Sequence, residues 1–255
     1  MCQAAKSRRA IAQFAPVVLD IEEQFPDHVW LYLTITVKNV PATELRNAFT
    51  GLLNPGMSRL SRRKAWPAIG WTVAREVTRG TKGDAHPHLH VLMLVPSEYL
   101  STGYMQQSEW VDLVQDAFKL NYKPSIRISR VQGKDGLHKA VLETFKYTVK
   151  SQDLVGDRSW CLTVTDQMHG LRARSHGGVF KQLLAAVSDE ETDLEDADEF
   201  EHLWFTPDPE AELTFLVWNH RQRSYVQVDQ PQPCHMVPYG TVEKWWIRDN
   251  PLNSS

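Results

Sequence analysis

Three histidines stand at alternate positions in one short segment, at His86, His88 and His90. If this segment is a β-strand, alternate side chains point to one face, so all three imidazoles share that face. Neutral imidazole is a good ligand for divalent metals. The pattern therefore predicts a metal site. A hydrogen-bonding role without metal is the weaker alternative, and a structural zinc site lacks the cysteine pair that it would use.

The preceding segment offers a carboxylate to complete that site. Residues 68–78 alternate as a strand, and Glu76 shares a face with small or polar neighbours. Across a hairpin this face would meet the histidines. A mixed nitrogen and oxygen site of this kind could hold Mg²⁺ or Mn²⁺ and leave positions open for substrate oxygens. We assign His88, His90 and Glu76 as ligands, with His86 as the alternative third ligand.

A second chemical group lies in the segment GLHKAVLETFKYTVKSQDL, which has a helical apolar pattern. Glu143, Tyr147 and Lys150 are spaced i, i+4 and i+7, so they would line one helix face. A phenol attacks phosphorus only when it is activated, and a lysine and a bound cation supply such activation. Glu143 could act as a general base for water. Without the histidines, an ordinary amphipathic helix with a surface Glu/Lys pair would be the better interpretation.

The elements that position these residues follow from hydrophobic periodicity. Alternation predicts strands at 29–38, 68–78, 86–95 and 125–131, and helical patterns occupy 8–25, 41–60 (broken at Asn54-Pro55-Gly56), 105–121 and 136–150. This order predicts an α+β, ferredoxin-like or RRM-like antiparallel sheet with helices on one face, which leaves the other face free for a site. Residues 157–187 are expected to add helices packed on that core.

The charge distribution divides the chain into three parts. Residues 188–212 carry 12 acidic side chains and no lysine or arginine, whereas residues 1–187 carry 24 basic and 16 acidic ones. We expect a domain at 1–187, an acidic linker at 188–202, and a small β-rich appendage at 203–255 with a hairpin around Asn219-His220. A basic body suits a nucleic-acid partner, although many protein surfaces carry a similar excess.

The bulk composition is that of a globular chain, with 42% hydrophobic and 23% charged residues. We find no apolar run long enough to span a membrane and no signal peptide, so a cytoplasmic protein without membrane contact is expected. The three scattered cysteines, Cys2, Cys161 and Cys234, fit a reducing compartment.

Taken together, the motifs resemble those of plasmid rolling-circle replication initiators of the HUH endonuclease superfamily, of the single-tyrosine type with an upstream catalytic glutamate. The first motif of that family corresponds to Thr34–Asn39, its metal motif to His88-Leu89-His90, and its nucleophile motif to Tyr147 with Lys150 and Glu143. Residues 170–183, GLRARSHGGVFKQL, resemble the segment that follows. The resemblance covers about residues 1–187. It also suggests a Cys-rich, zinc-binding element upstream, of which Cys2 would be a remnant.

The resemblance implies a function. Tyr147 would nick one strand of a plasmid origin, form a 5′-phosphotyrosine and leave a 3′-hydroxyl primer, with Mg²⁺ or Mn²⁺ as cofactor. Glu143 would assist hydrolysis at termination. Contacts to single-stranded or hairpin origin DNA would come from Lys146, Lys150, Thr34 and Thr36, and a host helicase is a candidate partner.

Two other classes stay open at this point. A conjugative relaxase or single-tyrosine transposase shares the chemistry but acts on different DNA. A metal-stabilised nucleic-acid-binding module without activity is also compatible with a ferredoxin-like fold, because that fold hosts many functions. The sequence leaves the oligomeric state and the origin sequence undetermined.

Overall fold

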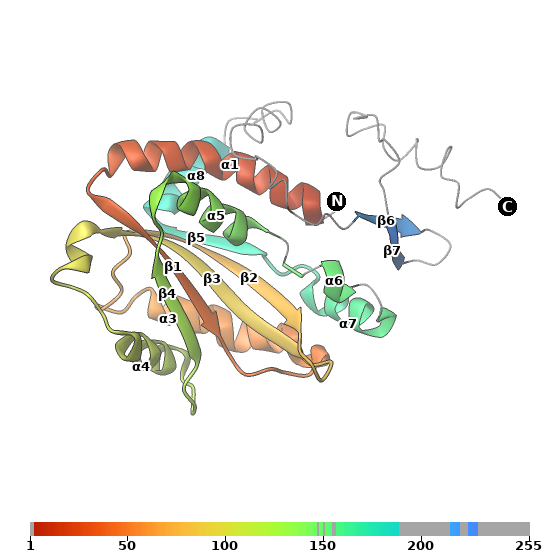
Figure 1. Ribbon diagram of the computed structural model, residues 1–255. Coiled ribbons are helices and arrows are strands. Elements are labelled where there is room, and N and C mark those ends of the chain that lie inside the picture. The colour runs from red at the N-terminus through yellow and green to blue at the C-terminus, as the bar shows by residue number, and fades with distance from the viewer. Residues whose placement is uncertain are drawn as a thin grey trace.

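The computed structural model describes residues 3–146, 148–149, 151–154, 157–188, 215–219 and 224–228. Its centre is a five-stranded sheet in the order β4-β1-β3-β2-β5, with every neighbouring pair antiparallel (Figure 1). The strands are β1 (His28–Thr36), β2 (Gly70–Arg79), β3 (Ala85–Pro96), β4 (Ser125–Arg130) and β5 (Arg174–Gly178). The first four strands have the ferredoxin-like order, so the predicted α+β class is confirmed.

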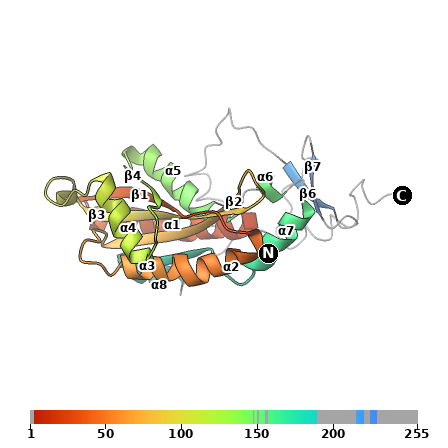
Figure 2. The same ribbon diagram turned by 90° about the horizontal axis from the view of Figure 1, so that it is seen from below.

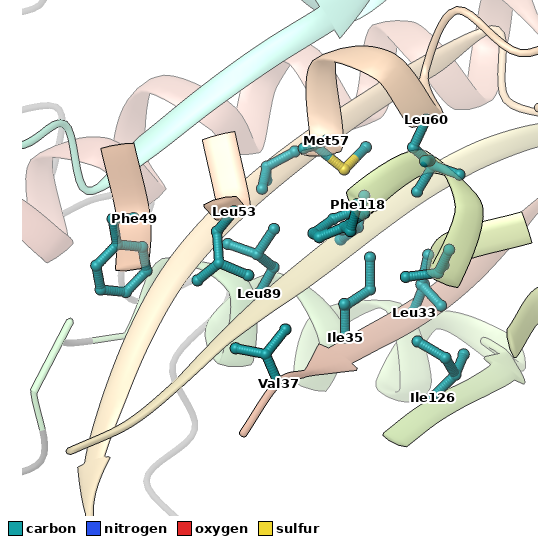
Figure 3. Close-up of a cluster of buried hydrophobic side chains, with 14 of the residues drawn as sticks. Leu33, Ile35, Val37, Phe49, Leu53, Met57, Leu60, Leu89, Phe118 and Ile126 are labelled. Carbon is teal, nitrogen blue, oxygen red and sulfur yellow. The ribbon is translucent and has the colours of Figure 1, made fainter. Parts of the chain in front are cut away.

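Apolar alternation places one face of the sheet in the main core. Leu33 and Ile35 of β1 and Leu89 of β3 are fully buried on that face. The covering layer consists of η1 (Ala42–Glu44), α2 (Leu45–Asn47), the π-helical turn η2 (Ala48–Leu53), α3 (Asn54–Leu60) and α4 (Gln107–Phe118). Phe49 and Phe118 fill the space between layers (Figure 3).

The expected break at Asn54-Pro55-Gly56 does not occur, because the chain stays helical from residue 42 to residue 60. Pro55 lies in the first turn of α3.

Helices also cover one end of the second sheet face. These are α1 (Gln3–Gln24), α5 (Gly133–Phe145) and α8 (Val179–Ser188). Phe14, Val141 and Phe180 from these helices form a second core with Trp30 and Leu92 of the sheet. Figure 2 shows α5 on the side of the sheet opposite α2 and α3. The other end of this face carries polar residues and holds the candidate site.

The sequence predicted helices over residues 157–187, but the structure forms a strand within this range. Helix α7 (Arg158–Met168) begins at Asp157, whose side chain accepts a hydrogen bond from the Trp160 N–H at 3.0 Å, but residues 174–178 then form β5 beside β2. Two glycines permit this pairing. A Cβ at Gly177 would lie 2.2 Å from the Trp71 ring, and Gly178 has a φ of +58°. Only glycine adopts such a conformation at low cost.

The remaining elements are α6 (Ser151–Leu154), η3 (Ser97–Leu100), β6 (Phe215–Asn219) and β7 (Ser224–Val228). β6 and β7 pair antiparallel, as the predicted hairpin required, while residues 220–223 and nearly all of the acidic linker lie outside the described residues. In the described part of the chain, no helix combines the length and the apolar character needed to cross a membrane.

Candidate active site

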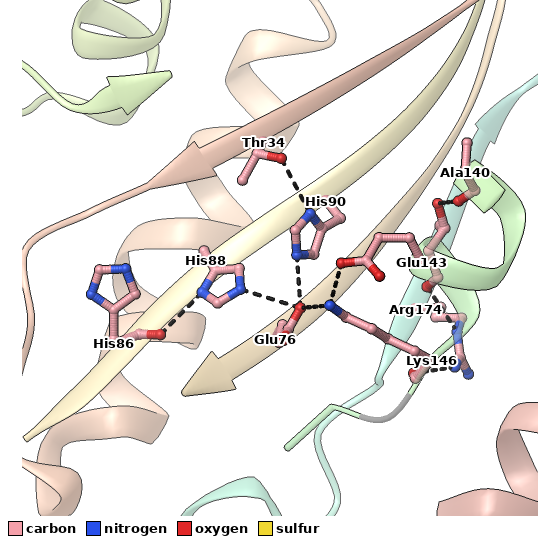
Figure 4. Close-up of polar contacts among 10 residues, drawn as sticks. Thr34, Glu76, His86, His88, His90, Ala140, Glu143, Lys146 and Arg174 are labelled. Atoms are coloured by element: carbon pink, nitrogen blue, oxygen red, sulfur yellow. Dashed lines mark hydrogen bonds and ion pairs between the residues drawn. The ribbon is translucent and has the colours of Figure 1, made fainter. Parts of the chain in front are cut away.

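The hairpin of β2 and β3 brings Glu76, His88 and His90 together at the polar end of the second sheet face (Figure 4). Glu76 is directly opposite His88 in the register of the hairpin. Its Oε2 atom lies 3.2 Å from His88 Nε2 and 2.7 Å from His90 Nε2. One ligand atom from each residue lies within 4.8 Å of the others. This is the mixed carboxylate and imidazole group that the sequence pattern predicts.

The far side of each imidazole is held by a second contact. His88 Nδ1 donates to the His86 carbonyl oxygen at 3.1 Å. A carbonyl only accepts, so neutral His88 must present a bare electron pair at Nε2, which faces Glu76. His90 Nδ1 lies 3.2 Å from the Thr34 hydroxyl, which can accept or donate. Such outer contacts orient histidine ligands in metal sites.

Glu76 is the charged centre of the group and is only 2% exposed. Burial opposes its ionisation, but the contacts with His88, His90 and Lys146 outweigh this effect and hold the pKa of the Glu76 carboxyl well below its ordinary value. Its Oε1 atom is buried and has no hydrogen-bond partner among the residues that the structure describes.

These observations test whether a divalent cation fits the group. A carboxylate oxygen and the Nε2 atoms of neutral imidazoles are electron-pair donors, and here they lie close enough together to hold one divalent cation. The unsatisfied Glu76 Oε1 adds a further donor atom. One carboxylate with two imidazoles and no thiolate suits Mg²⁺ or Mn²⁺ among other divalent ions. The residues present therefore fit such a cation.

His86, the alternative third ligand, is directed elsewhere. Its Nδ1 atom is hydrogen-bonded to the Asn39 side-chain oxygen, and Asn39 Nδ2 donates to Asp84 Oδ2 at 2.9 Å. Burial and the nearby His88 lower the pKa of the His86 imidazole. The geometry therefore favours Glu76 over His86. Asn39, the last residue of the first motif, ties the end of β1 to the β2–β3 turn.

Lys146 reaches this group from the end of α5. Its ammonium lies 2.8 Å from Glu76 Oε2 and also contacts Glu143 Oε1. Burial alone would lower the pKa of Lys146, but the two carboxylates raise it above its ordinary value. The structure thus places Lys146, predicted as a DNA contact, between two acidic residues.

The two threonines predicted to contact DNA lie beside the histidines on β1. Thr34 is opposite His90 and Thr36 is opposite His88 in the register of β1 and β3. Both are half-buried. Thr34 orients His90 through the contact described above, whereas their contact with nucleic acid stays a prediction.

The prediction of a continuous helix over residues 136–150 is wrong. α5 ends at Phe145, and the backbone at Lys146 is extended. Arg174 of β5 terminates the helix by donating to the carbonyl oxygens of Thr144, Phe145 and Lys146, the last at 2.9 Å. These carbonyls have no partner within the helix, so the guanidinium replaces the missing turn. The helical spacing that linked Glu143 to positions 147 and 150 does not apply.

Tyr147 and Lys150 themselves lie outside the described residues. The residues on either side of Tyr147 are nevertheless anchored. The Thr148 carbonyl accepts a hydrogen bond from the Val77 N–H at 2.9 Å, and Val149 forms a parallel bridge with Val77. Since Val77 follows Glu76, Thr148 and Val149 lie alongside β2 next to the position of this candidate metal ligand.

Sequence reasoning missed two residues of the site. Arg174 lies in the segment GLRARSHGG, but its capping role depends on β5, which the periodicity did not reveal. The Tyr32 ring stacks on His90, with centroids 5.5 Å apart. Burial and the nearby Glu143 and Glu76 raise the pKa of Tyr32 far above its ordinary value, so its phenol stays protonated. The alternation of β1, which places Tyr32 on the same face as Thr34, was the available signal.

Comparison with known proteins gives a consistent result. A family model described as "Replication protein" matches residues 1–226. The chain is 33% identical to "Protein rep" of Streptococcus pneumoniae serotype 2 (strain D39 / NCTC 7466), covering 88% of this chain and 72% of that relative. It is 29% identical to "Replication protein" of Staphylococcus aureus, covering 84% of this chain and 96% of that relative. It is 31% identical to "Protein rep" of Lactiplantibacillus plantarum, covering 72% of this chain and 62% of that relative. No solved structure matches the chain significantly.

Proposed function

Because this chain belongs to the replication protein family of plasmid replication initiators, we propose that it is a metal-dependent endonuclease that nicks one strand of plasmid origin DNA through Tyr147. The proposal rests chiefly on one observation. Glu76, His88 and His90 meet at the polar end of the second sheet face, and the His88 ring is fixed so that its Nε2 faces the carboxylate.

A divalent cation held by Glu76, His88 and His90 would supply positive charge to a scissile phosphate. The Tyr147 oxygen attacks phosphorus and loses its proton to solvent, while the bond to the 3′ oxygen breaks. The products are a 5′-phosphotyrosine and a 3′-hydroxyl, which takes up a proton from water. The phosphodiester is retained in the covalent link, so the step requires no nucleotide cofactor.

Glu143 has a different part in the proposal. It lies in the last turn of α5, with its side chain about half exposed and in contact with Lys146. A solvent-accessible carboxylate at this point could remove a proton from water that attacks the phosphotyrosine. Hydrolysis would then regenerate Tyr147 and end the cycle without a second tyrosine. Lys150 would stabilise phosphate or phenolate charge.

The edge strand β4 supports a path for DNA toward this site. Arg127 is exposed and lies directly opposite Thr34, on the sheet face that carries the histidines. Ser125 and Ser129 flank it on the same face and are exposed too. Arginine and hydroxyl side chains are common phosphate contacts, so this strand would bind the DNA backbone.

The test uses the full chain, Mn²⁺ and single-stranded oligonucleotides tiled across the plasmid that encodes it. Tyr147→Phe should abolish both the nick and the covalent DNA adduct seen on a denaturing gel. Tyr104→Phe, a change at an exposed tyrosine, should leave both unchanged. An adduct that persists in Tyr147→Phe would refute the assignment of the nucleophile.

A second variant separates the role of Glu143. Glu143→Gln should still form the adduct but release it by hydrolysis more slowly, by about 100-fold or more for loss of a general base. Release is measured by following the isolated adduct over time. Equal losses in adduct formation and release would argue against a specific role in hydrolysis.

A further inference from the structure

Lys146 occupies an unusual position for a surface lysine. Its ammonium contacts the same Glu76 oxygen, Oε2, that lies near both histidine Nε2 atoms, and its side chain is only 26% exposed (Figure 4). Its second partner is Glu143. The lysine is thus part of the candidate metal group, although an ammonium has only donors and cannot be a metal ligand.

The contact with Lys146 compensates the buried negative charge of Glu76. A carboxylate buried to the extent of Glu76 is costly unless a positive charge compensates it. An imidazole supplies positive charge only when it is protonated, whereas the ammonium of a lysine carries its charge throughout the neutral pH range. Among the residues that the structure describes, Lys146 is the permanently charged cation in contact with Glu76.

A divalent cation at Glu76, His88 and His90 would compensate the same negative charge with a greater positive charge. It would also place positive charges close together in a partly buried setting, where their repulsion is strong. We propose that Lys146 is a stand-in counter-ion, which neutralises Glu76 while no metal is bound and gives up that carboxylate when a divalent cation binds. This inference rests on the metal-dependent function proposed above.

The surrounding contacts let the side chain move without the backbone. The Lys146 carbonyl is held by Arg174, and the Thr148 carbonyl by the Val77 N–H. Exchange therefore requires only new rotamers of the lysine stem, while Glu143 remains available as its partner. Because Lys146 directly precedes Tyr147, metal loading would change the charge next to the proposed nucleophile.

The test measures Mn²⁺ binding to the full chain without DNA, by titration calorimetry at low salt. Removing the competing ammonium in Lys146→Met should tighten Mn²⁺ binding by about 3- to 10-fold, because the cation no longer has to displace an ion pair from Glu76. Lys139→Met is the matched control, because Lys139 is an exposed lysine on the preceding helix α5 and its loss changes the net charge equally. Lys139→Met should bind like the wild type.

A second variant and a second measurement keep the result independent of folding. Lys146→Arg retains the charge and should bind Mn²⁺ within about 3-fold of the wild type. In EDTA the melting temperature of Lys146→Met should fall below that of the wild type, and saturating Mn²⁺ should narrow this gap. Unchanged or weaker Mn²⁺ binding by folded Lys146→Met would overturn the exchange. If instead the wild type binds no Mn²⁺, or binds it equally well after His90→Ala, the proposed metal site is refuted, and the exchange is refuted with it.

Discussion

His90 and His176 lie on the same face of one sheet, on either side of β2, yet their surroundings are opposite. His90 is opposite Ala74 of β2 and meets Glu76, two residues along that strand. His176 is opposite Thr72, two residues in the other direction, and hydrogen-bonds its hydroxyl at 2.9 Å. About four residues of β2 therefore separate a charged group on this face from an apolar one.

The apolar end is made by helices. Phe14 of α1 and Phe145 of α5 each stack on the His176 ring, with centroids 6.4 Å away. Burial, with a contribution from the charge of Arg174, lowers the pKa of His176 from 6.5 to about 4, so it remains neutral near pH 7. The same side chain thus belongs to a candidate metal group or packs against aromatic helix residues, according to which elements cover the strand.

The largest expected effect on nicking comes from removing a proposed metal ligand. His90→Ala removes one proposed ligand and should reduce nicking by about 1,000-fold, or about 4 kcal/mol of transition-state stabilisation. Initial nicking rates at saturating Mn²⁺ measure it. His86→Ala is the control and should cost at most about tenfold, because the backbone carbonyl that orients His88 remains. Equal losses would make His86 the better candidate for a ligand.

Removing an aromatic side chain from the apolar end of the face should lower stability instead. Phe14 is fully buried against Phe145 and Phe180. Phe14→Ala leaves a cavity and should lower the free energy of unfolding by about 3 kcal/mol. Urea denaturation measures this change, while the nicking rate per folded molecule should be nearly unchanged. Leu19→Ala on the exposed side of the same helix should cost less than about 1 kcal/mol. Similar losses from both variants would contradict the assigned core.

The depressed pKa of His176 predicts a pH dependence of stability. Between pH 6.5 and about 4 the unfolded chain binds a proton at this residue and the folded chain does not. The stability that a neutral His176 provides is therefore present above pH 6.5 and is lost as the pH falls, by about 2 kcal/mol at pH 5. His176→Gln has no such proton to bind, so its stability difference between pH 8 and pH 5 should be smaller by that amount. An unchanged difference in urea titrations would show that His176 is not buried as described.

The smallest effect concerns the contact that orients His90. Thr34→Val keeps the shape of the side chain but removes the hydroxyl next to His90 Nδ1. Mn²⁺ affinity should fall by about 10-fold, as expected for loss of an outer hydrogen bond. Thr78→Val on β2 is a matched control, since Thr78 is opposite His86, and it should bind Mn²⁺ normally. If the two variants bind equally well, the Thr34 contact has no part in holding the imidazole.

The sequence by itself determined the main sheet and the histidine face. Period-two alternation locates the first four strands, because one side of each is buried in a core and the other is not. The same alternation places His88 and His90 on one face wherever the strand lies. The motifs of the nucleophile segment likewise identify the family, which the comparisons support independently.

Only the tertiary structure decided how the site is completed. The sequence proposed Glu76 from its face and hairpin position, but its meeting with the histidines depends on the hairpin register, because a shift of one residue would turn it to the other face. α5 ends at Phe145 because Arg174, 29 residues later, caps its carbonyls. β5 escapes periodicity analysis since its glycines carry no apolar pattern. These features arise from contacts between segments that are distant in the sequence, so local side-chain patterns do not predict them.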